Sequence, residues 1–560
     1  MAADCSSIRI AAWSLAVALG AACPLPAQSV ERVSVDSAGG EADLDSKWSG
    51  VSDDGNLVVF DSDATNLVAG DANGTTDVFL RDRLAGTTVR LSVDAAGAEA
   101  DGASSFPALT PDGRYVVFAS YASNLVAGDT NGFADIFVID RVAGTIERIS
   151  VDAAGAEADD DSLRPAISGD GRCVSFFSYA TNLVAGDTNR YADVFVVDRQ
   201  ARTIERVSVD GAGNQADLGS YVNSIASDGV RVAFVSDATN LVAADANNAR
   251  DAFVHDRSTG STVRVSVDSN GNEGIGGKAD SSRISADGTL CAYSSSADLL
   301  VPNDVNGRFD IFVHELATGA TELVSADPSG APVDRSSLHP RLSADGRFIL
   351  FQSNSALLVA GDTNGAHDLF LRDRRLGVTR RISIDPNGIE GDADSHVGWI
   401  STDGAWITSH SAATNLVPGD TNGVEDILLF HHCLPASWSN YGSGFAGALG
   451  VPAFTLRADP VLGTTVTADL ADSTGQGTLS VVLVGLDAAQ IPTGFGGTLL
   501  VSPIGSIMLA VPAGGATIDA DIPDDEALCG VSWFAQALEL DAAAAKGISF
   551  SAGLEIALGR

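Results

Sequence analysis

Residues 104–152 read SSFPALTPDGRYVVFASYASNLVAGDTNGFADIFVIDRVAGTIERISVD, and this stretch holds the local signals that decide the fold. Short apolar or alternating runs predict four β-strands, at residues 105–109, 115–120, 135–140 and 146–151. Turn residues separate these runs, beginning with Thr110-Pro-Asp-Gly113, and a long loop at residues 121–134 joins the second strand to the third. Helical periodicity is absent. The stretch is therefore expected to be all-β.

The same unit recurs along the chain. The heptapeptide D-x-N-x-x-x-D, which lies in the long loop, begins at Asp71, Asp129, Asp187, Asp245, Asp304, Asp362 and Asp420, at intervals of 58 or 59 residues. Self-similarity at a fixed period indicates a repeat architecture in which each copy is one supersecondary unit. Four short antiparallel strands per copy, repeated radially, predict a β-propeller.

The two ends of the repeat region complement each other. The seventh copy has strand patterns at residues 396–401, 405–410 and 426–430, but no fourth strand follows them. That fourth pattern stands instead at the N-terminus, as Glu31-Arg-Val-Ser-Val-Asp36. We expect this N-terminal "velcro" strand to complete the seventh sheet, because a closed ring has no free sheet edge, whereas an open solenoid has one. Residues 29–432 are thus predicted to form a seven-bladed β-propeller.

The second strand of each copy also carries a family resemblance. The segments TPDGRYVVFAS (110–120), SGDGRCVSFFS (168–178) and SADGRFILFQS (343–353) resemble the repeat of TolB-like propellers, the WD40-like PD40 repeats. The resemblance covers about residues 30–432. The chain differs from TolB in its blade number and in lacking an N-terminal α/β domain, so a role in the Tol system is not implied. The Gly-His and Trp-Asp marks of eukaryotic WD40 repeats are absent.

The charge and the N-terminus restrict partners and location. The chain has 73 acidic and 33 basic residues, a formal net charge of −40. Nucleic acid and anionic membrane surfaces repel such a polyanion. Residues 1–28 predict a signal peptide, with Arg9 before a short apolar run. We expect an exported protein, periplasmic, cell-surface or extracellular, with no transmembrane segment. Lipidation at Cys23 is a second interpretation, which Gly20 at the position of the lipobox leucine disfavours.

A smaller region follows the repeats. Residues 433–560 contain strand-like runs at 478–486, 498–502 and 548–558 between Gly and Pro turns, and they predict a β-sandwich-like domain. The end of this region resembles a module found on exported bacterial proteins. Cys433 and Cys529 bracket most of it and form a disulfide in one of two open interpretations. Cys173 and Cys291 lie in apolar runs and are expected to be buried free thiols.

The repeated heptapeptide is the candidate metal site. Calcium prefers six to eight oxygen ligands, and a tight turn with oxygen side chains at positions 1, 3 and 7 supplies three of them. The side chains that would hold calcium are Asp71, Asn73, Asp77, Asp129, Asn131, Asp135, Asp187, Asn189, Asp193, Asp245, Asn247, Asp251, Asp304, Asn306, Asp310, Asp362, Asn364, Asp368, Asp420, Asn422 and Asp426. The alternative is that Asp and Asn only cap their own backbone as Asx-turns, with no metal.

Two functions from different classes remain open. No G-x-S-x-G elbow or zinc-ligand spacing occurs, which favours a non-catalytic scaffold that binds a protein or a glycan. A carbohydrate-active lyase or hydrolase would instead need residues specific to single blades at the central funnel. Lys47, Trp48, Tyr221, Lys278, His339 and Trp399 are irregular between copies, but the sequence does not assemble them into a site.

Overall fold

The computed structural model describes residues 7–10, 28–243, 245–432, 436–495, 497–522 and 531–559. The chain divides into two compact units, Val30–His431 and a second unit built from the chain on either side of it. All secondary-structure elements assigned in the described residues are β-strands. Among them, no helix is long and apolar enough to cross a membrane. We call Val30–His431 the repeat unit.

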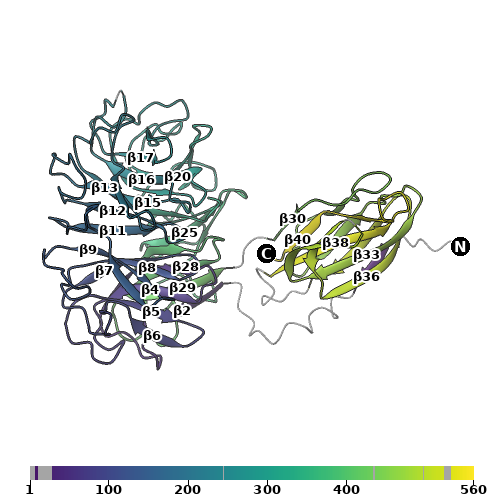
Figure 1. The fold of residues 1–560 in the computed structure, drawn as a ribbon, viewed down its shortest axis with the longest axis horizontal. Coiled ribbons are helices and arrows are strands. Elements are labelled where there is room, and N and C mark those ends of the chain that lie inside the picture. The colour runs from purple at the N-terminus through teal and green to yellow at the C-terminus, as the bar shows by residue number, and fades with distance from the viewer. Residues whose placement is uncertain are drawn as a thin grey trace. The chain divides into compact units, whose positions relative to one another are not determined.

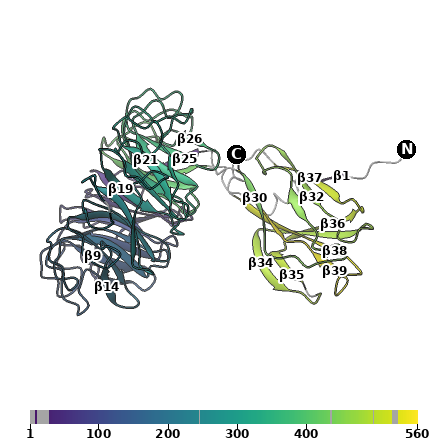
Figure 2. The same cartoon turned by 90° about the horizontal axis from the view of Figure 1, so that it is seen from above.

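The repeat unit consists of four-stranded antiparallel sheets, as the sequence predicts (Figures 1 and 2). The first three sheets are β3 (Ser46–Val51), β4 (Leu57–Ser62), β5 (Asp77–Asp82) and β6 (Thr87–Arg90); β7 (Ser104–Leu109), β8 (Tyr115–Ser120), β9 (Asp135–Asp140) and β10 (Thr145–Arg148); and β11 (Ser162–Ile167), β12 (Cys173–Ser178), β13 (Asp193–Asp198) and β14 (Thr203–Arg206).

The next three sheets repeat the order. They are β15 (Ser220–Ile225), β16 (Arg231–Ser236), β17 (Asp251–Asp256) and β18 (Ser261–Arg264); β19 (Ala279–Ile284), β20 (Leu290–Ser295), β21 (Asp310–Glu315) and β22 (Thr321–Leu323); and β23 (Ser337–Leu342), β24 (Phe348–Ser353), β25 (Asp368–Asp373) and β26 (Val378–Arg381). The last sheet takes its strands from both ends of the unit: β27 (Ser395–Ile400), β28 (Trp406–Ser411), β29 (Asp426–His432) and β2 (Gln28–Arg32).

The middle strands of the sheets hold the core, because both of their faces are covered by neighbouring sheets. Phe118 and Phe137 are paired across β8 and β9, are fully buried, and stack with ring centroids 5.8 Å apart. An aromatic pair occupies the same place in six of the seven sheets of the described repeat unit. The seventh has Ser409 paired with Leu428 there. These pairs explain why the aromatic residues recur with the period of the repeat.

The last sheet packs on the first. Ile427 and Leu429 of β29 share a hydrophobic cluster with Val58 and Phe60 of β4, and Figure 1 shows β4 and β29 side by side. The Thr402 backbone N–H and hydroxyl both donate to the Asp53 carboxylate, at 2.9 and 2.7 Å. The first and last sheets of the repeat unit are therefore in direct contact, although Asp53 and Thr402 are 349 residues apart in sequence.

The second unit contains two larger sheets that share one core. The first sheet has the strand order β1 (Ser7–Ile10), β37 (Ala516–Asp521), β32 (Thr465–Leu470) and β31 (Phe454–Leu456). The second has the order β30 (Ser437–Tyr441), β40 (Gly553–Ala557), β38 (Ser532–Leu540), β33 (Thr478–Gly485) and β36 (Gly505–Val511), and β39 (Ile548–Phe550) also pairs with β38. A separate two-stranded sheet consists of β34 (Asp487–Pro492) and β35 (Thr498–Ser502). Leu470 and Leu554 belong to the common apolar cluster. The rest of the predicted signal peptide, together with Cys433 and Cys529, lies outside the described residues.

Truncating one aromatic pair tests this account of the core. Phe137→Ala is expected to lower the free energy of unfolding by about 3–5 kcal/mol, because it leaves a cavity between two sheets. Leu84, which is 87% exposed, is the control, and Leu84→Ala is expected to change stability by less than about 0.5 kcal/mol. Urea denaturation of both variants measures the difference, and equal effects would contradict the assignment.

Candidate functional site

The asparagine of each predicted metal motif caps its own loop. Asn131 accepts the backbone N–H of Phe133 at 3.0 Å and donates from its amide to Asp135 at 3.0 Å. The corresponding asparagine accepts the N–H two residues ahead in all seven copies. The Asx-turn interpretation therefore describes the role of the asparagine. Whether the loops also bind metal is a separate question that depends on the two aspartates.

An arginine lies between the two motif aspartates in most copies. Arg148, on the outermost strand β10, places Nη1 3.0 Å from Asp129 and 3.2 Å from Asp135, and it also pairs with Glu157 at 2.7 Å. Arg90, Arg206, Arg264, Arg381 and Arg32 occupy the same position in five other loops, 3.0 to 3.6 Å from both aspartates. In these six loops a guanidinium lies between the two aspartates that the sequence predicts as calcium ligands.

The seventh loop receives its arginine from the other end of the chain. Arg32, at the end of β2, pairs with Asp426 and Asp420, and the Ser34 hydroxyl donates to Asp426 at 2.6 Å. Ser150 makes the equivalent bond to Asp135 in the second sheet. The N-terminal segment thus makes the same arginine and serine contacts to the motif aspartates as Arg148 and Ser150 make in the second sheet.

The fifth loop has no such cation. Leu323 stands where the other outer strands carry arginine, and Pro332 stands where most copies carry glutamate. Asp304 is 2% exposed, and its Oδ1 atom is buried with no hydrogen-bond partner. Burial, with Asp304 nearby, raises the pKa of Asp310 to about 7. This copy holds two buried carboxyl groups without a basic partner among the described residues.

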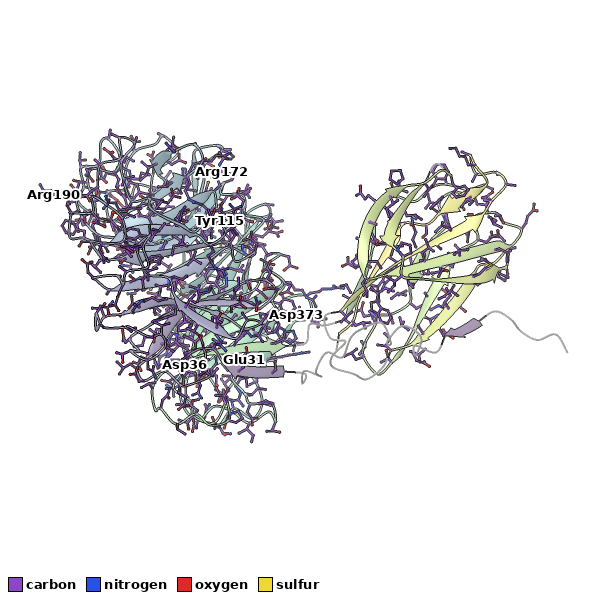
Figure 3. The ribbon with its side chains drawn as sticks, turned by 60° about the horizontal axis from the view of Figure 1, so that its bottom comes forward. Glu31, Asp36, Tyr115, Arg172, Arg190 and Asp373 are labelled. Atoms are coloured by element: carbon purple, nitrogen blue, oxygen red, sulfur yellow. The ribbon has the colours of Figure 1, made fainter. Side chains whose placement is uncertain are left out.

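The motif loops and the Asp-Gly turns lie at opposite ends of the strands, so we call these two sides of the repeat unit the loop face and the turn face. Figure 3 labels Arg190 of the third motif on one side and Arg172, Tyr115 and Asp373 on the other. On the turn face, Arg172 pairs with Asp198 at 2.7 Å. On the loop face, Asp152 and its equivalents accept backbone N–H groups, as turn caps do.

The first strands of all seven sheets of the repeat unit contribute residues to one cavity. A cavity of about 140 Å³ near the turn face is lined by Val51, Leu109, Ile167, Ile225, Ile284, Leu342 and Ile400, one residue from each first strand. Two further cavities, of about 70 and 320 Å³, continue toward the loop face. We call this series of cavities the axial channel. Its walls are the place where all copies of the repeat meet.

Two repeat positions on the channel wall differ from sheet to sheet. At the first position the sheets carry, in order, Trp48, Phe106, Arg164, Val222, Ser281, His339 and Val397. At the second they carry Gly50, Ala108, Ala166, Ser224, Arg283, Arg341 and Trp399. The loops, by contrast, are nearly identical. The regular repeat is therefore broken at positions on the first strands rather than in the loops.

Three arginines in the channel lack an acidic partner. Among the described residues, no carboxylate oxygen lies within 4.0 Å of the guanidinium nitrogens of Arg164, Arg283 or Arg341. Arg283 and Arg341 donate to backbone carbonyls instead. Burial lowers the pKa of Arg283 to about 10, and repulsion from Arg164 adds to the shift. These three arginines thus line the channel together with the carboxylates of Asp53 and Glu425 at its two ends, and the nearby Asp280 partly opposes the lowering of the Arg164 pKa by burial.

Aromatic rings lie against these cations. The Arg164 guanidinium is 4.9 Å from both the Trp48 and the Phe106 ring centroids, and that of Arg341 is 5.4 Å from the Trp399 ring. Cation–π contacts of this kind contribute about 0.5–2 kcal/mol each and hold the guanidinium planes in place. Trp48, His339 and Trp399, which the sequence left scattered, are brought together here.

The backbone is strained where these side chains enter the channel. Phe106, Arg164, Val222 and His339 have positive φ angles of 57°, 51°, 43° and 56°. All four lie at register shifts between the first and second strands. Such conformations cost about 1–3 kcal/mol for non-glycine residues and concentrate at functional sites. Aligning the repeats would have found these positions from the sequence; the spacing of charged residues along the chain could not.

Other predicted residues lie elsewhere. Tyr221 packs edge-on against Phe177 rather than lining the three cavities, and Lys278 is exposed. Cys173 and Cys291 are buried free thiols, which confirms the expectation for both.

No family model matches the sequence, and no curated protein matches it. One similar solved structure is a prolyl endopeptidase, with 12% sequence identity and a TM-score of 0.42; the match covers 78% of this chain and 55% of that one. A putative TolB from Agrobacterium tumefaciens has 16% identity and a TM-score of 0.32, over 54% of this chain and 88% of that one. The extracellular domain of a putative hybrid two-component system from B. thetaiotaomicron has 12% identity and a TM-score of 0.38, over 80% of this chain and 46% of that one. The chain thus spans about half the length of the first and the third. Membership of the TolB-like repeat family stays a prediction.

Removing one loop arginine tests the buried network. Burial raises the pKa of Asp129 to about 6, so this group stabilises the fold below its ordinary pKa and loses that contribution as the pH rises through about 6. Arg148 opposes the shift. Arg148→Met is therefore expected to cost about 3–5 kcal/mol at pH 8, and clearly less at pH 5, below the raised pKa of Asp129, where that carboxyl group is mostly protonated.

Urea unfolding at the two pH values measures this difference. Arg335, whose side chain is 59% exposed, gives the control variant Arg335→Met. A loss that is equal at pH 5 and pH 8 would show that the arginine acts through packing rather than charge.

Proposed function

We propose that this protein is an exported, non-catalytic binding propeller that takes an anionic glycan into its axial channel. The repeat unit is, in this proposal, a closed seven-bladed ring. The N-terminal sequence supports export, and the seven four-stranded sheets, the pairing of β2 with β29 and the cavity lined by all seven first strands support the ring.

The main support for a negatively charged ligand is the set of channel arginines without an acidic partner. Many arginines of the repeat unit pair with carboxylates, as Arg148 and Arg172 do, although Arg81 and Arg141 donate to backbone carbonyls instead, and acidic residues are in large excess. Leaving Arg164, Arg283 and Arg341 unpaired and partly desolvated costs free energy that an anion in the channel would recover. Guanidinium groups bind carboxylates through paired N–H donors, which makes an acidic group the favoured complement.

The surrounding side chains support a sugar acid over a simple inorganic ion. Trp48, Phe106 and Trp399 add flat apolar surfaces beside the arginines. Trp48 and Arg341 also line the adjoining cavity at the loop face, about 320 Å³, which is within the size range of small-molecule sites. A ring that carries a carboxylate would match both the apolar surfaces and the cations. The ligand class we propose is an oligosaccharide that contains uronic acid.

Calcium binding by the motif loops stays a prediction, which we now restrict to the fifth loop. Six loops already hold a guanidinium between their aspartates, whereas Asp304 and Asp310 have none. A cation there would stabilise two buried carboxylates.

A catalytic role on the same ligand is the second candidate function. It is favoured by His339, whose pKa burial lowers to about 4, so that a neutral imidazole stands beside the channel arginines. A neutral imidazole can accept a proton from a sugar carbon or from water. Release of unsaturated or reducing sugars from acidic polysaccharides would identify this activity.

The ligand proposal predicts a specific loss of affinity. A disaccharide that contains glucuronate is expected to bind the wild-type protein, and Arg164→Gln is expected to weaken binding about 10- to 100-fold, because one charge-assisted contact is lost. Isothermal titration calorimetry measures both affinities.

Two controls separate charge recognition from a general effect. Arg172→Gln removes an arginine of the turn face and is expected to leave the affinity unchanged. A neutral disaccharide of the same linkage is expected to bind much more weakly. Equal binding of neutral and acidic sugars would exclude the proposal.

The restricted calcium proposal has its own test. Calcium is expected to raise the melting temperature of the wild-type protein relative to EDTA, with one ion per chain by mass spectrometry. Asp304→Asn is expected to abolish the rise, whereas Asp129→Asn, in a loop that contains arginine, is expected to leave it intact. Several ions per chain would show instead that the arginines do not exclude calcium.

A further inference from the structure

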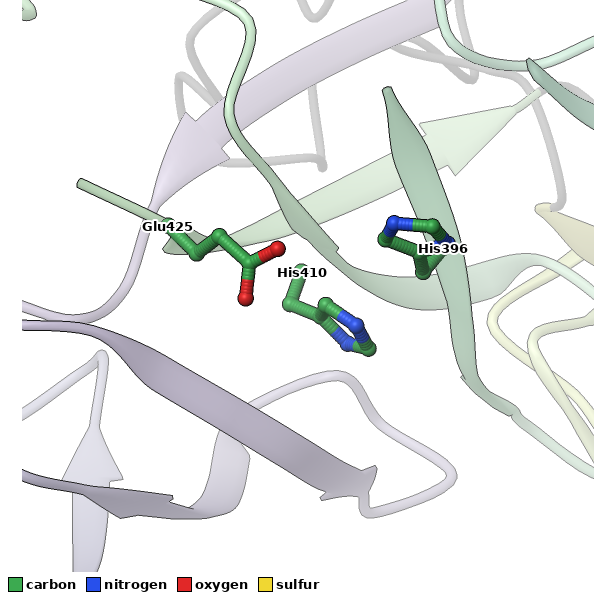
Figure 4. Close-up of side chains that lie close together, drawn as sticks. All are labelled: His396, His410 and Glu425. Carbon is green, nitrogen blue, oxygen red and sulfur yellow. The ribbon is translucent and has the colours of Figure 1, made fainter. Parts of the chain in front are cut away.

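A group of metal-binding side chains lies at the loop-face end of the axial channel, away from the motif loops. His396 on β27 and His410 on β28 are paired directly opposite each other, and Glu425 immediately precedes β29. One ligand atom from each of these residues lies within 4.8 Å of the other two. Figure 4 shows the His410 ring between the Glu425 carboxylate and His396.

One member of the group has an unused nitrogen. The Nδ1 atom of His410 is buried and has no hydrogen-bond partner. A buried nitrogen without a partner is costly, and a metal ion is one group that would satisfy it.

The surroundings leave room for a metal and for further ligands. These three side chains line the cavity of about 320 Å³ together with Lys47, Trp48 and His339. We propose that His396, His410 and Glu425 bind a zinc-like divalent transition metal. Two imidazoles and one carboxylate are a common protein ligand set for such ions, and the set leaves coordination positions open toward the cavity.

The distances require only a small adjustment. Zinc–ligand bonds of about 2.0–2.2 Å place ligand atoms roughly 3–4 Å from one another. The two histidines are held by adjacent paired strands, with ring centroids 4.9 Å apart. Glu425 lies just outside a strand, and its side chain is 25% exposed. Rotation of the glutamate side chain toward the two rings brings the atoms into range.

Lys47 now neutralises the glutamate. Its ammonium lies 3.7 Å from the Glu425 carboxylate and 3.1 Å from that of Asp45. A divalent ion at Glu425 would repel this ammonium, which keeps Asp45 as its partner. Removing the charge of Lys47 should therefore strengthen metal binding, whereas removing a ligand should weaken it. If the cluster only stabilised the fold, the Lys47 and ligand substitutions would not change the metal affinity in opposite directions.

The inference does not rest on the proposed glycan. Metal binding is tested without any sugar, on full-length protein free of affinity tags, by titration with Co²⁺ and Zn²⁺. One Co²⁺ per chain is expected, with visible absorption bands that Zn²⁺ displaces. His396→Gln, His410→Gln and Glu425→Gln are each expected to weaken binding at least tenfold, and Lys47→Gln to strengthen it.

His431→Gln is the matched control, because His431 lies in the same sheet beside Trp406, away from the cluster. It is expected to bind Co²⁺ as the wild-type protein does. Thermal melting shows whether each variant is folded, and a second glutamate variant, Glu425→Asp, is expected to retain measurable binding. No stoichiometric Co²⁺, or equal loss in His431→Gln, would overturn the proposal.

Discussion

The guanidinium that lies between two motif aspartates joins three parts of a sheet: the outermost strand, the long loop and the start of the third strand. Arg148 makes these contacts to Asp129 and Asp135, and the same contacts recur in five other loops. In the last sheet the arginine is Arg32, from the opposite end of the repeat unit. The network that stabilises each loop therefore also ties the N-terminal strand to the seventh sheet. The first strand of that sheet, β27, lines the same cavity as the first strands of the other six sheets.

The residues that line the axial channel differ from those of the motif loops in charge and in how regularly they repeat. The loops are repetitive, and their carboxylates are largely neutralised by arginines within the same sheet. The channel concentrates different residues at equivalent positions, with cations such as Arg283 and Arg341 that have no acidic partner. In the proposed function, near-identical sheets supply the scaffold, and two variable positions on their first strands supply the contacts to the ligand. The fifth loop, with Leu323 in place of arginine, is where the regular pattern of the loops is broken.

The repeated sheets could be predicted from the sequence because their signals are local: strand alternation, Asp-Gly turns and a fixed period. The pairing of β2 with β29 was also predictable, since one strand pattern was missing at one end and present at the other. The position of the arginine between the aspartates was not predictable, because Arg148 is 13 residues from Asp135 and contacts it only after strands β9 and β10 have paired. The channel was missed for a similar reason. Arg164 and Arg341 are far apart in sequence, and a bulge in each first strand decides which side chain enters the axis.

A structure of the protein with a bound ligand tests the central claim most directly. Crystals soaked with a disaccharide that contains glucuronate should show density in the axial channel, with the carboxylate against the guanidinium groups of Arg164, Arg283 or Arg341 and a sugar ring beside Trp48 or Trp399. A channel that stays empty while the sugar occupies another surface would contradict the account. The axial arginines would then serve the packing of the first strands alone.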